Sequence, residues 1–292
     1  MTQPALDIVI VSYRSRDLLR ACLASLNEHA PRLPTRVFVV DNGSTDGSVE
    51  MLRNEFGDVE LEAAGANLGF AKANNRAIVR GSAPYVLVLN PDTRFTADDS
   101  LDDLVALMES RPEIGICGCR LELEDGTFDH AARRSFPTPL GALGHFTGIG
   151  RRASAPASLA QYRAPQVEAG AVDAVNGAFM LIRRAALDSA GLFDEGYWMY
   201  MEDLDLCYRF VQAGWTVWYE PSVTVVHAKA GSSGPVRSPR LNYAFHYGMF
   251  RFYRQHYASQ RNPLVNGAVY CGIATKLGLS LARNGLRHAL GR

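Results

Sequence analysis

The chain has 292 residues, enough for one large α/β domain with appendages or for two small domains. Its 47% hydrophobic and 21% charged residues, with a formal net charge of zero, are those of an ordinary soluble globular protein. The five cysteines have no CxxC spacing, which argues against a disulfide framework or a zinc site and agrees with a reducing cytoplasm.

Short β-branched runs alternate with helical patterns along the chain. Strands are predicted at 7–13, 36–40, 59–62, 85–89, 176–182 and 223–227. Helical patterns are expected at 17–26, 48–56, 70–79 and 200–211. Because strands and helices alternate in the first half, the pattern predicts βαβ units and a mostly parallel sheet flanked by helices. Between the two halves, the stretch from Arg133 to Val167 is typical of a loop.

Polar residues lie at the carboxyl ends of three of the predicted strands, the edge where ligands bind in open parallel sheets. They are Ser12 and Tyr13, Asp41, and Asn90 with Asp92. No glycine lies between the first predicted strand and the first predicted helix, which argues against a dinucleotide-binding enzyme. A triphosphate-holding glycine-rich loop is missing there too, which argues against a sugar-nucleotide pyrophosphorylase.

Two aspartates at this edge have both a functional and a structural interpretation. Asp41 is placed to accept hydrogen bonds from a nucleotide base or ribose, although for an isolated aspartate a helix cap or an Asx turn is the favoured interpretation. Asp92 can bind a divalent cation that bridges the phosphates of a nucleoside diphosphate, or it can cap a turn.

A group of carboxylates occurs further along the chain. Glu202, Asp203 and Asp205 lie within four residues and beside aromatic side chains, so burial is expected to raise the pKa of at least one of them. Such a carboxylate can act as a general base, whereas a solvated helix face is the structural alternative. His227 follows a predicted strand, where a histidine is more often structural than a metal ligand.

The chain resembles the family 2 inverting glycosyltransferases of the GT-A fold and, within them, the bacterial rhamnosyltransferases. The resemblance spans roughly residues 6 to 234 in family order. It rests on the segments IVIVSYRS, VVDNGSTDGS, ANLGFAKANN, LNPD, NGAFMLIRR, FDEGYWMYMEDLDLCYR and HAKAGSSG.

The resemblance implies a role for each candidate residue. Asp203, in the Glu202–Asp203 pair, matches the catalytic base. Asp92 matches the metal-binding aspartate of the DXD motif, in which Asn90 replaces the first acid, and His227 matches a second ligand for Mg²⁺ or Mn²⁺ or for diphosphate. The expected donor-binding residues are Ser12, Tyr13, Asp41, Asn67, Gly69, Asn90 and Lys229, and the expected acceptor-binding residues are Gly177, Ala178 and Trp198.

The resemblance also implies the reaction. The acceptor hydroxyl, deprotonated by the base, attacks the anomeric carbon in one inverting displacement, through an oxocarbenium-like transition state. The expected donor is dTDP-L-rhamnose, with UDP-galactofuranose and UDP-glucose as alternatives, and the expected acceptor is a lipid-linked or cell-surface glycan. A non-catalytic nucleotide-sugar-binding protein is a further alternative, which the presence of Asp203 disfavours.

The C-terminal part of the chain is basic. From Pro221 onward there are ten Lys and Arg residues and no Asp or Glu, so the first 220 residues carry the other twenty basic residues and all thirty acidic ones. We predict a catalytic unit at 1–234 and a helical basic extension at 235–292, which binds an anionic membrane surface through an amphipathic helix. A helical hairpin packed on the core is the structural alternative.

The expected location is cytoplasmic and peripheral, on the inner face of the cell membrane. Nucleic acid could use the same positive charge, but the resemblance points to lipid-linked acceptors, and no nucleic-acid partner is expected.

Overall fold

The computed structural model describes residues 3–98, 100–137, 168–229 and 238–289. Its centre is one mixed sheet. The strands of that sheet are β1 (Leu6–Ser12), β2 (Thr35–Asp41), β3 (Glu60–Ala63), β4 (Tyr85–Leu89), β5 (Thr93–Phe95), β6 (Ile114–Glu122), β8 (Gly170–Ala171), β10 (Phe179–Arg183) and β11 (Thr216–His227). The order is β3-β2-β1-β4-β10-β6-β11-β5, with β8 paired to β11.

The first four strands form a parallel half-sheet, as the alternation of strands and helices predicted. β10 is antiparallel to both of its neighbours, β4 and β6. Because of this reversal, the chain that enters β10 lies at the same edge as the chain that leaves β4. The direction of β10 therefore brings residues 176–178 to the edge where the polar residues gather.

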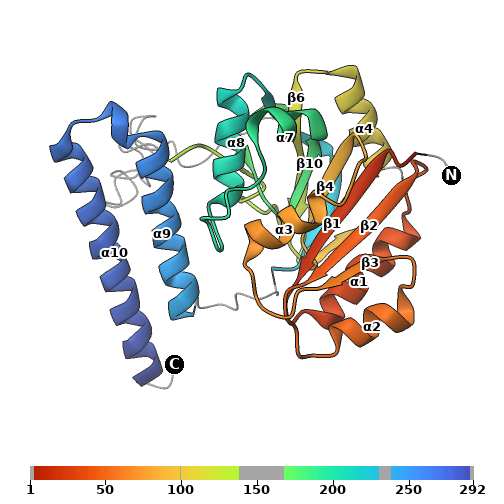
Figure 1. Cartoon of the computed structure of the whole chain (residues 1–292), viewed down its shortest axis with the longest axis horizontal. Coiled ribbons are helices and arrows are strands. Elements are labelled where there is room, and N and C mark those ends of the chain that lie inside the picture. The colour runs from red at the N-terminus through yellow and green to blue at the C-terminus, as the bar shows by residue number, and fades with distance from the viewer. Residues whose placement is uncertain (1–2, 99, 138–167, 230–237, 290–292) are drawn as a thin grey trace.

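Helices cover both faces of the sheet (Figure 1). One face packs on α1 (Arg16–Glu28), α2 (Ser48–Glu55) and α4 (Ser100–Ser110), and the other packs on α3 (Phe70–Ile78), α7 (Arg184–Ala190) and α8 (Glu202–Gln212). Side chains along β1 alternate between these two cores, Ile8 toward the first and Val9 toward the second. Burial on both faces explains why the strands contain continuous β-branched runs rather than an alternating pattern.

A two-stranded sheet lies beside the main one. It pairs β7 (Arg133–Arg134) with β9 (Ala174–Val175) in antiparallel fashion. The stretch from Arg133 to Val167, expected as a loop, therefore begins with a short strand, and its residues 138–167 lie outside the described residues.

The C-terminal extension is helical, as expected. α9 (Pro239–His256) and α10 (Pro263–Ala289), joined through a short 3-10 turn (Ala258–Gln260), form a hairpin in which α10 lies outermost (Figure 1). By length and composition alone, Pro263–Gly285 could cross a membrane, and a single helix of this kind is weak evidence for a span. The division at residues 234 and 235 stays a prediction, because residues 230–237 lie outside the described ranges.

Candidate active site

Three polar positions lie together at one edge of the sheet. Ser12 and Asp41 end β1 and β2 and are neighbours in the strand register, and Asn90 follows β4 on the other side of β1. Because the chain goes from β1 to β2 and β3 and then returns to β4, this edge is a topological switch point, where open α/β sheets bind ligands. The buried Ser12 hydroxyl lies 2.9 Å from that of Ser15, and Tyr13 is half-buried.

Asp41 uses one carboxylate oxygen for the local turn. Its Oδ1 accepts hydrogen bonds from the backbone N–H groups of Gly43 (3.2 Å) and Ser44 (2.9 Å). Its Oδ2 is buried and has no hydrogen-bond partner among the described residues. The Asx-turn interpretation therefore holds for the first oxygen, while the second is available to a ligand.

The predicted donor residues Asn67 and Gly69 are tied to this strand end. The Asn42 side-chain amide donates to Asn67 Oδ1 (3.3 Å) and to the Gly69 carbonyl (3.2 Å). Gly69 has φ +87°, and a Cβ there would lie 2.3 Å from the Trp198 carbonyl oxygen. That carbonyl accepts a hydrogen bond from the Phe70 N–H (2.8 Å). Only glycine fits this close approach, which joins the loop before α3 to the loop before α8.

A second polar group lies where β11 ends beside β5. His227 Nε2 lies 3.4 Å from Asp92 Oδ1, and His227 Nδ1 lies 3.2 Å from Asp129 Oδ2. Lys229 donates through Nζ to Asp129 Oδ1 (2.6 Å). Asp92 Oδ1 is buried and receives no hydrogen bond from the residues described. Asp92 and His227 are thus brought together, and a buried aspartate supports the imidazole from behind.

The charges of this group are strongly coupled. Burial alone would lower the pKa of His227, but the hydrogen bond to Asp129 and the negative charge of the nearby Asp92 outweigh burial and raise the pKa to about 9. Burial alone would raise the pKa of Asp129, but hydrogen bonds from His227 and Lys229 lower the pKa to about 2.

The fit of this group to a metal ion depends on ligands from outside the chain. No group of three or more His, Cys, Asp or Glu side chains in the described ranges is arranged to hold a metal. Asp92 and His227 supply two adjacent ligands of suitable chemistry, and the orphaned Asp92 oxygen fits a cation whose other ligands are diphosphate oxygens and water.

Asp203 is held at the N-terminus of α8. Its Oδ2 accepts a hydrogen bond from the Gly177 N–H (3.0 Å) and forms an ion pair with the Arg134 guanidinium. Arg134 also donates to the Val175 carbonyl (3.0 Å), so β7 and β9 fix its position. The Asp203 carboxylate is therefore buried, oriented and paired with a positive charge.

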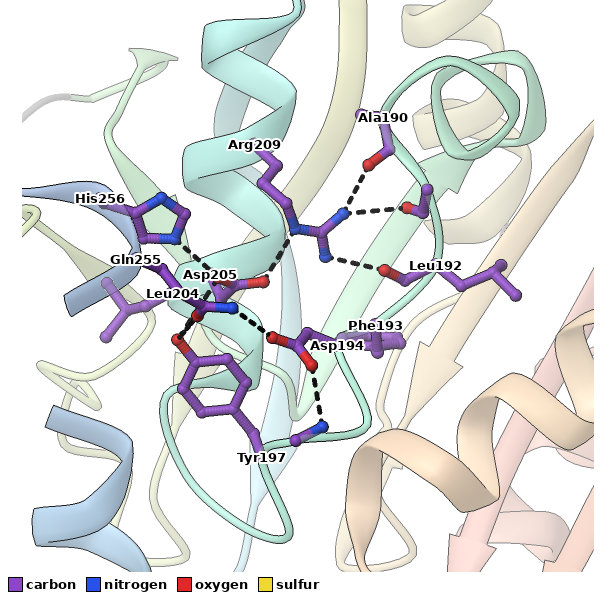
Figure 2. Close-up of polar contacts among 12 residues, drawn as sticks. Ala190, Leu192, Phe193, Asp194, Tyr197, Leu204, Asp205, Arg209, Gln255 and His256 are labelled. Atoms are coloured by element: carbon purple, nitrogen blue, oxygen red, sulfur yellow. Dashed lines mark hydrogen bonds and ion pairs between the residues drawn. The ribbon is translucent and has the colours of Figure 1, made fainter. Parts of the chain in front are cut away.

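The three neighbouring carboxylates have different surroundings. Burial raises the pKa of Glu202 to about 8, and the adjacent Asp203 carboxylate adds to this rise. Asp205 makes other contacts, accepting hydrogen bonds from His256 Nε2 (2.7 Å) and Arg209 Nε (2.8 Å) (Figure 2). The expected rise in the pKa of one acid thus falls on Glu202, whereas the Asp205 carboxylate is bound by His256 and Arg209.

The turn before β10 connects these groups. The Asn90 N–H donates to the Ala178 carbonyl (2.9 Å), which joins this turn to the segment that carries Asp92. A Cβ on Gly177 would lie 3.4 Å from the Asp203 Cβ and from the Phe70 ring. The predicted donor, acceptor, metal and base residues therefore belong to one continuous set of loops at the same edge of the sheet.

Several buried polar atoms at this edge lack a hydrogen-bond partner in the described part of the chain. They are Asp41 Oδ2, Asp92 Oδ1, Trp198 Nε1 and Glu202 Oε2. Buried polar atoms are nearly always satisfied, so a concentration of exceptions at one site is typical of a ligand-binding surface.

Comparisons with known proteins agree with this geometry. The profile described as Glycosyl transferase family 2 matches residues 7–191. N-acetylglucosaminyl-diphospho-decaprenol L-rhamnosyltransferase of Mycobacterium tuberculosis is 35% identical over 255 residues, which are 83% of this chain and 81% of that protein. The chain belongs to glycosyl transferase family 2. It is therefore an enzyme, a glycosyltransferase, as the resemblance of its motifs implied.

Other relatives of this glycosyltransferase are more distant. Rhamnosyltransferase WbbL of Escherichia coli is 27% identical over 228 residues, 75% of this chain and 82% of its own length. The structure of mannosyltransferase PcManGT from Pyrobaculum calidifontis, in complex with GDP-Man and Mn²⁺, has a TM-score of 0.59 at 18% identity and covers 98% of this chain and 76% of that one. This likeness confirms the GT-A fold.

Two residues of the glycosyltransferase site were not predicted from sequence. Asp129 contacts a histidine 98 positions away, and Arg134 contacts an aspartate 69 positions away. No motif or spacing marks either residue, because both depend on tertiary contacts.

Proposed function

We propose that this glycosyltransferase transfers L-rhamnose from dTDP-L-rhamnose to a hydroxyl of a lipid-linked or cell-surface glycan, with inversion at the anomeric carbon. The observation that carries the proposal is the concentration of unsatisfied buried polar atoms on Asp41, Asp92, Trp198 and Glu202. The choice of sugar is supported by the names of two relatives, both rhamnosyltransferases, one of them acting on a decaprenol-linked substrate.

The base side of the site consists of Arg134, Gly177, Glu202 and Asp203. Asp203 accepts the proton from the acceptor hydroxyl as that oxygen attacks the anomeric carbon. Hydrogen bonding from the Gly177 N–H and the ion pair with Arg134 keep the carboxylate oriented. Glu202, whose pKa is raised by burial, retains its proton and spares the pair a second negative charge.

The diphosphate side consists of Asp92, Asp129, His227 and Lys229. Negative charge accumulates there as the nucleoside diphosphate departs. Asp92 and His227 would hold a divalent cation, Mg²⁺ or Mn²⁺, which when bound neutralises that charge. Asp129 orients His227 through Nδ1, the arrangement by which carboxylates commonly fix metal-binding histidines. Lys229, held on Asp129, adds positive charge.

The remaining residues bind the two substrates. Asp41 Oδ2 accepts a hydrogen bond from the pyrimidine nucleoside, and the loop with Asn67 and Gly69 closes the donor pocket. Ser12, Tyr13 and Asn90 border the same pocket at the sheet edge. On the acceptor side, Gly177 and Ala178 form the floor, and the buried Trp198 Nε1 donates to an acceptor oxygen.

A thermal-shift comparison followed by a turnover assay tests the donor. We expect dTDP to stabilise the fold more than GDP, since a bound ligand raises stability by mass action. With a polyprenyl-diphosphate-linked sugar as acceptor, dTDP-L-rhamnose should be consumed faster than UDP-galactofuranose or UDP-glucose. Preferential stabilisation by GDP would contradict the rhamnose assignment, and binding of dTDP without turnover of any donor would indicate a binding protein instead.

We further propose that the extension binds the anionic cytoplasmic face of the membrane and so brings the enzyme to a lipid-linked acceptor there. Apolar side chains are exposed on α10, among them Leu264 (85%) and Leu279 (63%), and basic residues such as Arg283 lie on the same exposed helix. An apolar helix surface with basic neighbours suits an anionic headgroup region.

Sedimentation with anionic liposomes tests the membrane proposal. The double variant Leu264→Gln/Leu279→Gln should sediment less than wild type. Deletion of Asn262 to Arg292 should reduce sedimentation further without abolishing dTDP binding. Val79→Gln is the matched control, because Val79 is a 65% exposed apolar residue on the catalytic core. Equal, salt-insensitive sedimentation of all four proteins would overturn the proposal.

A further inference from the structure

The loop that leads into the Glu202–Asp203 pair has an unusual backbone. Tyr200 and Met201 have φ values of +70° and +73°, in the left-handed region that side chains other than glycine rarely adopt. Consecutive residues of this kind persist only where surrounding contacts impose the conformation. The element that packs against this loop therefore has to supply those contacts.

That element is α9. A Cβ on Gly248 of α9 would lie 3.0 Å from the Tyr200 carbonyl oxygen, so helix and loop meet at their backbones. A Cβ on Gly196 of the loop would lie 2.2 Å from the guanidinium carbon of Arg251. At the start of α9, the Arg240 guanidinium lies 3.9 Å from the centre of the Trp198 ring. The helix thus covers the loop along its length.

A set of polar contacts fastens the two together. Arg251 forms a bidentate ion pair with Asp194, at 2.9 Å from Nε to Oδ2 and 2.9 Å from Nη2 to Oδ1. The Gln255 side-chain amide donates to the same carboxylate (2.9 Å) (Figure 2). Both donors come from α9, and Asp194 lies at the beginning of the loop, so this end of the loop is fixed to the helix.

The first turn of α8, which follows the loop, is fixed to α9 in the same way. His256 donates through Nε2 to the Asp205 carboxylate (2.7 Å), which is 1% exposed and lies two residues after Asp203 (Figure 2). The Tyr197 hydroxyl lies 3.0 Å from Gln255 Oε1, between the two anchoring points. The α9 clamp, defined as Arg251, Gln255 and His256, therefore holds carboxylates on both sides of the left-handed turn.

We propose that the α9 clamp is a positioning device for catalysis, which sets the Asp203 carboxylate and Trp198 by holding the loop between Asp194 and Asp205. The inference rests on the proposed role of Asp203 as the base. None of the three clamp residues touches the base, so they act through the loop. Releasing the clamp lets the left-handed turn relax and moves the base relative to the acceptor hydroxyl. The proposed contacts of Asp41 and Asp92 with the donor stay intact, because these residues belong to other elements, and the Trp198 carbonyl keeps its backbone hydrogen bond to the Phe70 N–H.

The test compares two arginines of the same helix. Arg251→Gln removes the bidentate pair, whereas Arg254→Gln changes an exposed arginine outside the clamp. We expect Arg251→Gln to lower kcat by ~10- to 10²-fold, the cost of a small misplacement of reacting groups. The KM for the donor and the thermal shift given by dTDP should remain those of wild type, and Arg254→Gln should match wild type in every measurement. A wild-type kcat for Arg251→Gln would overturn the proposal.

A second pair of variants serves if Arg251→Gln does not fold. His256→Phe keeps the ring packing against Tyr208 but loses the hydrogen bond to Asp205, whereas His256→Gln retains a donor. His256→Phe should lower kcat with the donor KM unchanged, and His256→Gln should recover part of the loss. Equal kcat for these two variants and wild type would refute the clamp. Asp203→Asn is measured in parallel: an active Asp203→Asn removes the proposed base, whereas wild-type activity of the clamp variants removes only the present inference.

Discussion

The base side and the diphosphate side of the site both bury carboxylates, but burial has opposite outcomes in the two. Glu202 Oε2 has no hydrogen-bond partner in the described ranges, so desolvation prevails and the pKa of Glu202 rises to about 8. Asp129 receives hydrogen bonds from His227 and Lys229, which overcome desolvation and lower its pKa to about 2. Partners, rather than depth of burial, decide the charge of each acid.

This difference separates two tasks that the proposed reaction requires. In the proposed reaction, the base side limits negative charge, so that one carboxylate accepts a proton while its neighbour stays neutral. The diphosphate side places an aspartate behind a histidine and a lysine, and in the same proposal it stabilises negative charge that develops on the leaving group. Variants on each side should therefore fail in different measurements.

The largest effect is expected from the base side. Asp203→Asn keeps the shape and the hydrogen bond from Gly177 but cannot accept a proton, so kcat should fall by ~10²–10⁴-fold. The thermal shift given by dTDP should persist. Steady-state turnover of dTDP-L-rhamnose measures the first quantity, and a ligand titration measures the second. Near-wild-type turnover, together with an inactive Glu202→Gln, would show that the base has been assigned to the wrong acid.

An intermediate effect is expected from the diphosphate side. Asp129→Asn removes the charge behind His227 and should weaken Mn²⁺ binding in the presence of dTDP by ~10- to 100-fold, the usual effect of losing a residue that orients a metal ligand. Electron paramagnetic resonance of free Mn²⁺ measures this directly. Asp125→Asn, an exposed acid in the same segment, should bind Mn²⁺ as wild type does. Unchanged affinity in Asp129→Asn would remove the supporting role.

The smallest effect is a change in the pH dependence of stability. The pKa of Glu202 is raised in the folded state from 4.5 to about 8, so the folded protein keeps a proton that the unfolded chain releases. The contribution of Glu202 to the free energy of unfolding is complete below 4.5, its pKa in the unfolded chain. This contribution is lost as the pH rises through about 8, its pKa in the folded protein. Glu202→Gln should thus show a smaller fall in the free energy of unfolding between about pH 5 and about pH 8 than wild type.

Denaturant unfolding at several pH values measures this difference. Glu109→Gln, on the exposed side of α4, is the control and should follow the wild-type curve. If Glu202→Gln also follows that curve, Glu202 is ionised in the folded protein and the contrast between the two sides is wrong.

The parallel half of the fold was predictable because its strands are buried on both faces. β1, β2 and β4 therefore appear in the sequence as continuous apolar runs, and the polar residues that follow them mark the switch point. β6 was missed because Gly115 and Gly118 interrupt its apolar run, although they fit close contacts with Trp215 and Val175. The antiparallel direction of β10 has no local signal, since it depends on pairing with distant strands.

The same distinction between local and distant signals applies to the residues of the candidate site. Asp92 and Asp203 were each found from a motif whose residues lie close together in the sequence. Asp129, Arg134 and the α9 clamp were not, because their partners are far away in sequence and only the folded chain brings them together. Residues that touch substrates tend to cluster in loops, whereas residues that orient them come from any packed element.

The anomeric configuration of the product tests the central claim most directly. In our account, a single base on one side and a charge-stabilising group on the other lead to one in-line displacement. NMR of the glycoside formed from dTDP-L-rhamnose should therefore show an anomeric configuration opposite to that of the donor. Retention of the donor configuration would require a covalent intermediate or an equivalent second step. It would contradict the division of the site into a base side and a diphosphate side.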